Sequence, residues 1–474
     1  MTGKSKPTTQ RQRHASYKSL RIEFDPGAPV TAFAGLALTD KLARRAGLWS
    51  ALKRALPTRC GYDWTTVVKS LAMGLMTGSR GTHAAEDLRQ DPVLQRILGL
   101  PAPGGKDRLG AVPEEATIWR ALSQLASDGK AGPALERETT RAAARLLVEM
   151  PARSLGPEGF VSFFIDGTLL EGTRRREGTK YIGEKGHGLL WTVAFVGPVP
   201  VAAHLCGTGE GEGEATAART LLGRVHDEVL VPAGLKERAL LLQDSLHGNG
   251  PSLLAAEEKG LHYVVGAGAL ARTAQVLDEQ PGGQWKPSPG FDKRRGAEGS
   301  KVIVASLQCE DWEKSRTLVA RRWHMPGDLF EHRLAVLTNL TPEHPQLASL
   351  MAAKKLPFAE AVLWLYDKKG GCETHFKSLL TDLGLHHPPS QHAAHNTGFY
   401  MIGLLAGMLS AITALVEQAA SKGPLPTVAT LRRRLWALPG WITQSGRTLT
   451  VRILGLSPLW HQQIEGFWRR ACRC

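Results

Sequence analysis

Apolar residues follow two periodicities along this chain, and the change between them divides it. From residue 36 to about residue 148 they recur at intervals of three and four, which is typical of amphipathic helices. Proline and glycine between residues 101 and 105 interrupt this region. From residue 160 onward, short apolar runs alternate with polar and glycine-containing segments, which predicts strands. The pattern therefore predicts a helical N-terminal region followed by an α/β region.

The order of elements in the second region indicates its fold. Apolar runs predict strands at residues 160–165, 189–196 and 199–205, a helix at 215–229, a strand at 239–243, a helix at 253–259 and a strand at 262–265. Three strands followed by alternating helix and strand is the order of a ribonuclease-H-like core. Further strand-like runs at residues 301–307, 317–323 and 333–340 predict a β-rich insertion in that core.

These patterns divide the chain into five segments. We expect a basic flexible arm at residues 1–25, a helical domain at 26–150, the first part of the core at 151–268, the β-rich insertion at 269–355, and a core helix with a C-terminal helical region at 356–474. Residues 399–416 carry no charge and approach the minimum length of a membrane span. A helix that is apolar on all sides is also consistent with burial in a large domain. Because no second span accompanies it, we predict no membrane partner.

Two aspartates follow apolar runs of the predicted core. Asp166 comes directly after the run at residues 160–165, and Asp244 comes directly after the run at 239–243. A charged residue is expected at the exposed end of a buried strand. Because the first and fourth strands of a ribonuclease-H-like core are neighbours, Asp166 and Asp244 are expected to lie next to each other in the sheet. Taken singly, each is also explained as a strand-terminal acid without a catalytic role.

A third acid, Glu373, lies in a segment with a helical pattern. At about 100° per residue, Tyr366, Lys369 and Lys377 fall within a narrow arc that also contains Glu373. One helical face would then carry an aromatic ring, two cations and a carboxylate. Such a face suits a polyanion bound beside a metal ion.

Three carboxylates in this order indicate phosphoryl transfer on DNA. Magnesium or manganese prefers hard oxygen ligands, and two such ions roughly 3.5–4 Å apart stabilise both the attacking and the leaving oxygen of an in-line displacement. The predicted cofactor is accordingly two Mg²⁺ or Mn²⁺ ions, and the predicted ligands are Asp166, Asp244 and Glu373.

These motifs together resemble the IS1380 family of bacterial insertion-sequence transposases, within the wider IS4-type DDE group. The resemblance covers roughly residues 30–457. In the predicted core, its motifs are the three acids, Asp244-Ser245 before a helix and a Tyr-Val-Val strand, and the Tyr-x-x-Lys-x-x-x-Glu-x-x-x-Lys segment at 366–377. Outside the core, they are Asp87 and Asp91 in the helical region and Leu431-Arg432-Arg433-Arg434 before Leu438-Pro439-Gly440. Two positions depart from the family pattern: Lys369 stands where an arginine is usual, and Leu380 where many relatives carry a lysine. Because lysine is a point charge and arginine a fork, phosphate contacts are expected to differ.

The resemblance implies a cut-and-paste DNA transposase with a ribonuclease-H-like core. By this resemblance, Asp166, Asp244 and Glu373 hold the ions, Tyr366 contacts the DNA end, and Lys369 and Lys377 bind phosphates. The helical segment at 26–150 would recognise the element ends. The implied partners are the terminal inverted repeats and target DNA, bound by a homodimer, and the implied location is the cytoplasm, at the nucleoid.

Composition agrees with a polyanionic partner. The chain of 474 residues carries a formal net charge of +15, which favours DNA through counterion release but is also explained by a solvated basic surface. The N-terminal 21 residues are basic, without the apolar stretch of a signal peptide. The 42% hydrophobic content is that of a globular protein.

Several other features have two readings each. Arg294, Arg295, Arg316, Arg321 and Arg322 would give the insertion a basic edge for DNA, or simply a charged edge strand. The glycine- and glutamate-rich run at 207–214 lacks the lysine of a phosphate loop and is predicted to be a turn before a helix. His386, His387, His392 and His395 form a polar loop or, without cysteine partners, a transition-metal site.

Two functions compete with transposition: a nuclease without joining activity, and a domesticated DNA-binding protein.

Overall fold

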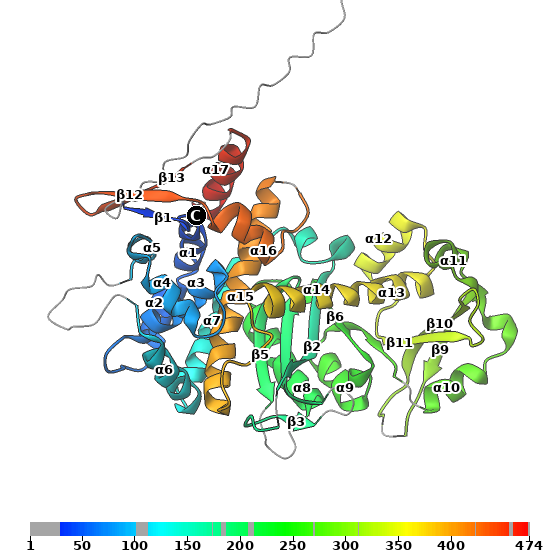
Figure 1. The fold of residues 1–474 in the computed structure, drawn as a ribbon. Coiled ribbons are helices and arrows are strands. Elements are labelled where there is room, and N and C mark those ends of the chain that lie inside the picture. Colours follow the sequence, from blue (N-terminus) through cyan, green and yellow to red (C-terminus); the bar gives the residue numbers. More distant parts are fainter. Residues whose placement is uncertain are drawn as a thin grey trace, which may run out of the picture.

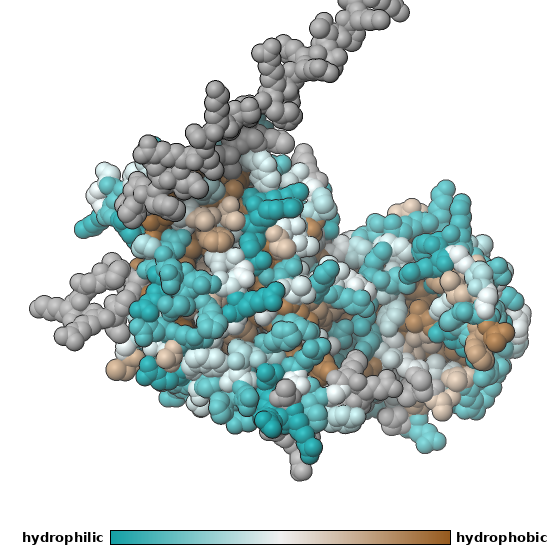
Figure 2. Space-filling view, in the orientation of Figure 1, coloured by the Kyte–Doolittle hydropathy of each residue, from teal (hydrophilic) through white to brown (hydrophobic). Residues whose placement is uncertain are grey.

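The computed structural model describes residues 29–100, 112–172, 174–181, 186–206, 213–268, 271–310, 312–421, 423–454 and 458–472. The predicted arm at residues 1–25 and the glycines of the 207–212 run lie outside these ranges. Figure 1 shows helices gathered on one side of the molecule, a sheet in the middle, and a second lobe of strands and short helices on the other side. In the space-filling view this face is mostly hydrophilic, with small apolar patches (Figure 2).

A ten-stranded mixed sheet forms the centre. Its order is β3-β4-β2-β6-β7-β11-β10-β9-β8, and β5 pairs with β4. The strands of its first half are β2 (Val161–Glu171), β3 (Lys180–Tyr181), β4 (His187–Val196), β5 (Val199–Cys206), β6 (Ala239–Gln243) and β7 (His262–Gly266). The path β5-β4-β2-β6-β7 starts with antiparallel pairs and continues with the parallel pairs β2–β6 and β6–β7. The first and fourth strands are therefore neighbours, as the sequence predicted.

The parallel part of the sheet is covered on its faces. All five residues of β6 are buried, which explains why this strand is an unbroken apolar run and not an alternating one. Helix α8 (Glu214–Val225) packs on β4 and β5, and α9 (Gly250–Glu258) packs on β7. These helices join successive strands, so the α/β pattern in the sequence follows directly from the fold.

Three strands of the predicted insertion extend the same sheet. They are β9 (Glu298–Leu307), β10 (Arg316–His324) and β11 (His332–Thr338), and β11 joins β7 in antiparallel register through Val336–Gly266 and Thr338–Val264. A short edge strand, β8 (Lys286–Pro287), completes them. The helices of this lobe are α10 (Ala271–Asp278), α11 (Pro289–Arg295) and α12 (Pro345–Lys354).

Two arginines of the expected basic edge are buried. Arg316 on β10 is 6% exposed and makes a two-pronged contact with the Glu257 carboxylate at 2.9 and 3.1 Å. Arg321 is 1% exposed, and its guanidinium lies 4.0 Å from the centre of the Phe291 ring. For these two residues the DNA-edge reading is wrong, because their side chains point into the lobe and stabilise it.

The N-terminal helices surround one long helix from the C-terminal half. They are α1 (Leu36–Arg45), α2 (Leu48–Ala55), α3 (Trp64–Thr77), α4 (His83–Arg89), α5 (Pro92–Leu98), α6 (Glu115–Ser127) and α7 (Ala131–Leu147). The long helix, α15 (Ala393–Ser421), contacts α1, α3, α6 and α7 and also β5. Its most apolar window is 89% buried, so its apolar sides face protein, as expected for a core helix.

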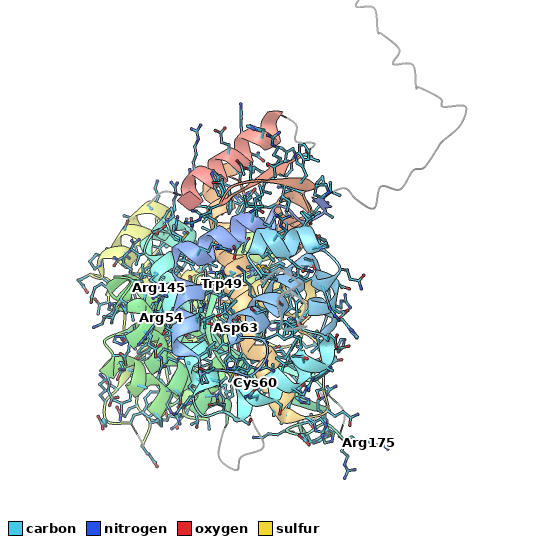
Figure 3. All side chains as sticks on the ribbon, turned by 90° about the vertical axis from the view of Figure 1, so that its left-hand side faces the viewer. Trp49, Arg54, Cys60, Asp63, Arg145 and Arg175 are labelled. Atoms are coloured by element: carbon cyan, nitrogen blue, oxygen red, sulfur yellow. The ribbon has the colours of Figure 1, made fainter. Side chains whose placement is uncertain are left out.

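A small sheet joins the two ends of the described chain. Strand β1 (Val30–Thr31) pairs with β12 (Gly440–Ser445), which pairs with β13 (Thr448–Ile453). Nearby, the Trp436 indole donates a hydrogen bond of 2.9 Å to the Thr39 hydroxyl. Helix α17 (Pro458–Cys472) packs on α1 and α15. Figure 3 shows the outer face of the helical region, with the exposed Arg54 and Arg145 on it.

Most predicted elements are confirmed, and two differ in extent. Strand β2 continues to Glu171, so Asp166 lies within a strand and not at its end. The predicted single helix around Glu373 is interrupted: α13 (Phe358–Tyr366) leads into a 3₁₀ turn at Asp367–Gly370, then α14 (Gly371–Lys377), then a π-helical turn at Ser378–Asp382. A 3₁₀ turn advances by more than 100° per residue, so the uniform helical arc assumed for this face does not hold. The domain boundaries remain a prediction.

Candidate active site

Two aspartates stand level with each other on adjacent parallel strands. The last parallel pair between β2 and β6 joins Phe164 to Leu242, and Asp166 and Asp244 each lie two residues beyond it. The strands separate here, because β6 ends at Gln243 while β2 continues in its antiparallel pairing with β4. Polar side chains at the carboxyl ends of parallel strands face a shared crevice.

Each aspartate also has a local structural role. The Asp244 carboxylate caps the short 3₁₀ helix at Ser245–His247 and accepts a hydrogen bond of 3.0 Å from the backbone N–H of Leu246. The Asp166 carboxylate accepts one of 3.1 Å from the N–H of Gly167. Its other oxygen lies 2.9 Å from the Lys369 ammonium. Backbone contacts of this kind hold each carboxylate in a fixed orientation.

The Lys369 ammonium is positioned by charge. Burial would lower its pKa, but attraction to the Asp166 carboxylate, and then to Asp244, raises the pKa overall. Lys369 is thus firmly protonated between the two strands. Tyr366, three residues earlier, has a raised pKa, first because of burial; Lys369 opposes this rise, while Asp244 and Asp166 add to it. Tyr366 is therefore a neutral phenol beside the acids.

Glu373 comes from α14, which packs against β2. Its side chain is exposed, while that of Cys372 beside it is buried. Burial raises the pKa of the Cys372 thiol, and the carboxylates of Asp166, Glu373 and Asp244 raise it further. All three predicted acids thus contribute to the raised pKa of this one thiol. Lys377 is exposed at the end of α14 and has no ion-pair partner among the described residues.

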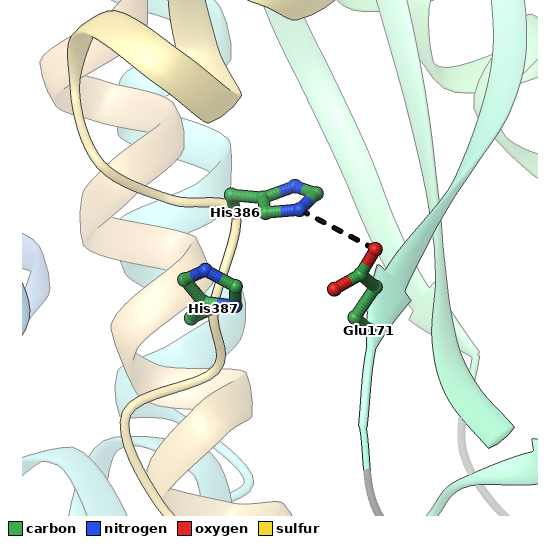
Figure 4. A group of neighbouring side chains, drawn as sticks. All are labelled: Glu171, His386 and His387. Atoms are coloured by element: carbon green, nitrogen blue, oxygen red, sulfur yellow. Dashed lines mark ion pairs between the residues drawn. The ribbon is translucent and has the colours of Figure 1, made fainter.

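The three acids do not form a closed single-ion cage. Among the described residues, the group of three whose ligand atoms lie within 4.8 Å of one another is Glu171, His386 and His387 (Figure 4). His386 Nε2 lies 3.8 Å from Glu171 Oε1, and both side chains are well exposed. His392, from the same loop, instead pairs with Glu177 at 3.1 Å.

The donor set at the aspartates nevertheless suits hard divalent cations. Asp166, Asp244 and Glu373 supply carboxylate oxygens, the ligands that magnesium and manganese prefer. Asp166 already contacts one positive charge, because the Lys369 ammonium forms an ion pair with its Oδ2 atom. Glu373 is solvent-exposed.

One further carboxylate, missed in the sequence, lies at the same place. Glu214 opens α8, and a methyl group added at Gly167 would meet its Oε1 atom at 2.5 Å. The buried His247 has its Nε2 atom 3.8 Å from Glu214 Oε1 and 3.8 Å from Asp244 Oδ1. The glycine- and glutamate-rich run around residue 210 predicts only a turn, and no spacing rule connects it to Asp166. Only the packing of α8 on β2 reveals the contact.

A cleft opens beside Asp244. It has a volume of about 440 Å³, and its lining includes Ser245, Gly266, Arg333 and Tyr366. The Tyr366 hydroxyl lies so close to Gly266 that a methyl group there would meet it at 2.8 Å. One wall comes from α10 and β11, so the sheet extension contributes to the surroundings of the acids.

Comparisons with known proteins identify the family. The chain matches the family described as "Transposase DDE domain group 1" over residues 12–463. A solved structure with partial likeness is titled "Cryo-EM structure of piggyBac transposase synaptic complex with hairpin DNA (SNHP)"; the identity is 12%, the match covers 85% of this chain and 79% of that chain, and the TM-score is 0.43. No curated protein matches. Because the family match spans nearly the whole chain, this protein belongs to the DDE transposase family.

Proposed function

We propose that this protein is a metal-dependent, cut-and-paste DNA transposase that cleaves the ends of its element and joins them to target DNA. The observation that carries the proposal is the level placement of Asp166 and Asp244 on adjacent parallel strands, with the Lys369 ammonium against Asp166. Membership of the DDE transposase family supports a polynucleotidyl transferase. The strand order β5-β4-β2-β6-β7 supports a ribonuclease-H-like core.

The carboxylates of Asp166, Asp244 and Glu373 would hold two divalent ions. Such ions supply a Lewis acid at the scissile phosphate and lower the pKa of bound water. The chain itself orients the acids: the Leu246 N–H fixes Asp244, and Gly167 N–H and Lys369 fix Asp166. Lys369 keeps positive charge at the strands, where the DNA phosphates must approach.

The DNA contacts follow from the same neighbourhood. Tyr366 lines the cleft beside Asp244, where a nucleotide at the element end would lie against its ring. Lys377 is exposed one helical turn beyond Glu373 and would contact the DNA backbone. We further propose an IS1380-type element of the IS4 group, end recognition by the helical region, a homodimer on DNA, and a cytoplasmic, nucleoid-associated location.

The test is the removal of one carboxylate charge at a time. Asp166→Asn, Asp244→Asn and Glu373→Gln keep the shape of the side chain but lose the anionic ligand, so each should abolish end cleavage in Mg²⁺ or Mn²⁺. Binding to a labelled element end in a mobility-shift assay should remain close to that of the unmodified chain. Wild-type cleavage by any one of these variants removes that residue from the site.

A strand-transfer assay separates the main alternative. Pre-cleaved ends offered with a target plasmid should be joined by the unmodified chain, since the same ions and acids serve both steps. Cleavage without any joining would identify a nuclease, and binding without either step would identify a domesticated DNA-binding protein.

A further inference from the structure

A fourth carboxylate borders the aspartates, and the fold makes room for it. Glu214 is the first residue of α8, and its carboxylate lies directly over Gly167, the residue after Asp166. The side chain is 18% exposed, so it is not sealed from solvent. Any larger residue at position 167 would place its Cβ atom 2.5 Å from Glu214 Oε1. The glycine is thus what allows the two acids to come this close.

A buried histidine links Glu214 to the second aspartate. His247 has no exposed surface, and neither of its ring nitrogens has a hydrogen-bond partner among the described residues. Its Nε2 atom lies 3.8 Å from Glu214 Oε1 and 3.8 Å from Asp244 Oδ1. A buried polar group without a hydrogen bond costs free energy unless something completes its contacts. The ring faces two carboxylates, so it is placed to orient them.

The carboxylates of this arrangement suit a cation. Asp166, Asp244 and Glu214 supply three carboxylates near one edge of the sheet, and among the described residues the ion pair of Lys369 is with Asp166. Carboxylate oxygens are the ligands that hard divalent cations prefer. Glu214 belongs to α8, whereas Glu373 belongs to α14.

We propose that Glu214 is a further ligand for a divalent cation held by Asp166 and Asp244, and that His247 is the positioning residue that orients the Glu214 and Asp244 carboxylates. This inference rests on the proposed function, because it assigns a fourth donor to the same metal site. The site is then built from β2, β6 and two helices, so that neither helix alone determines cation binding.

Manganese binding to the full-length chain tests the proposal without relying on activity. The affinity for Mn²⁺, measured by calorimetric titration, should fall about tenfold or more in Glu214→Gln. Glu313→Gln, which changes an exposed glutamate in the turn between β9 and β10, is the matched control and should bind as the unmodified chain does. His386→Ala/His387→Ala removes the exposed Glu171 group, so binding there is separated from binding at the aspartates.

A second variant displaces the Glu214 carboxylate without changing Glu214 itself. Gly167→Ala adds a methyl group where Glu214 Oε1 now lies, and the flexible carboxylate should be displaced while the strand remains intact. It should therefore weaken Mn²⁺ binding like Glu214→Gln, with an unchanged far-ultraviolet circular dichroism spectrum. His247→Phe should keep the buried shape and weaken binding less than Glu214→Gln does.

The outcomes distinguish this inference from the proposed function. If Asp166→Asn loses Mn²⁺ binding while Glu214→Gln and Gly167→Ala bind like Glu313→Gln, Glu214 is no ligand and the proposed function stands. If Asp166→Asn and Asp244→Asn also bind Mn²⁺ as the unmodified chain does, both the role of Glu214 and the metal site of the proposed function are wrong.

Discussion

His375 shows how a single residue on the helix of Glu373 supports the site from behind. Its ring lies 5.9 Å from the Phe164 ring of β2 and 5.7 Å from the Phe195 ring of β4. Burial lowers the pKa of His375 to about 4, so it is neutral near pH 7. The neutral ring fixes α14 against the strand that carries Asp166.

Replacement of His375 should change the pH dependence of stability. In the unfolded chain the pKa of His375 is about 6.5, which is higher than its pKa of about 4 in the folded protein. The unfolded state therefore binds more protons between these values, and stability is complete above about pH 6.5 and is lost as the pH falls toward 4. Each unit of pKa difference corresponds to about 1.4 kcal/mol.

The measurement is urea unfolding at pH 7 and pH 5. His375→Phe keeps the ring contacts and removes the titrating group. Between pH 7 and pH 5 its free energy of unfolding should therefore fall by less than that of the unmodified chain, with a difference on the order of 1–2 kcal/mol. The control is His324→Phe, because His324 is exposed on β10. Equal losses in the His375 variant and the unmodified chain would contradict the role given to burial.

At the scale of elements, α15 depends on close backbone approach to α6. A methyl group added at Gly398 would lie 2.4 Å from the carbonyl oxygen of Leu122, which is shorter than any real contact. Because the obstacle is backbone, the two helices would have to separate. Gly223, within α8, has nothing within 4 Å of such a methyl group.

These two glycines should respond in opposite directions to the same substitution. Gly398→Ala should lower the free energy of unfolding by about 1–3 kcal/mol, as overpacking does. Gly223→Ala should raise it by roughly 0.5–1 kcal/mol, because alanine restricts the unfolded chain and favours a helix. Thermal melts monitored by circular dichroism compare the two, and a neutral Gly398→Ala would show that α15 and α6 pack more loosely than described.

The sequence predicted the helices and strands better than the side-chain contacts between them. Periodicity located β6 to the residue, and the apolar run at 399–416 located the middle of α15 but missed five or six residues at each end, because apolar runs depend on burial alone. It also placed Asp166 and Asp244 on neighbouring strands. It did not predict the burial of Arg321 against Phe291, or the position of Glu214 beside Gly167. Both depend on contacts between segments distant in sequence, and such contacts leave no local pattern.

For the whole molecule, the charge of +15 predicts strongly salt-dependent DNA binding. Each phosphate neutralised by lysine or arginine releases counterions, so the logarithm of the binding constant should fall with that of the salt concentration by roughly 0.9 per contact. Exposed arginines such as Arg54 and Arg145 remain available for these contacts. Arg316 and Arg321 do not, because they are buried.

Fluorescence anisotropy with a labelled duplex of unrelated sequence checks this expectation. Binding should weaken by about a thousandfold or more between roughly 50 and 200 mM salt if six or more phosphates are contacted. Asp166→Asn is the suitable chain for the titration, since cleavage then cannot change the ligand. A flat response over this range would contradict a basic DNA-binding surface.

The pairing of β1 with β12 has a consequence for how the protein is made. Residues 30–39 are synthesised before the core and the insertion, whereas Trp436, strand β12 and α15, the helix that fills the centre of the N-terminal bundle, are synthesised after them. The early helices therefore cannot complete their core until α15 and β12 have been synthesised. A chain terminated by a frameshift within the insertion would retain both aspartates, yet it would lack Glu373, α15 and the partner strand of β1. Folding of the N-terminal bundle thus depends on synthesis of the segments that follow the catalytic core.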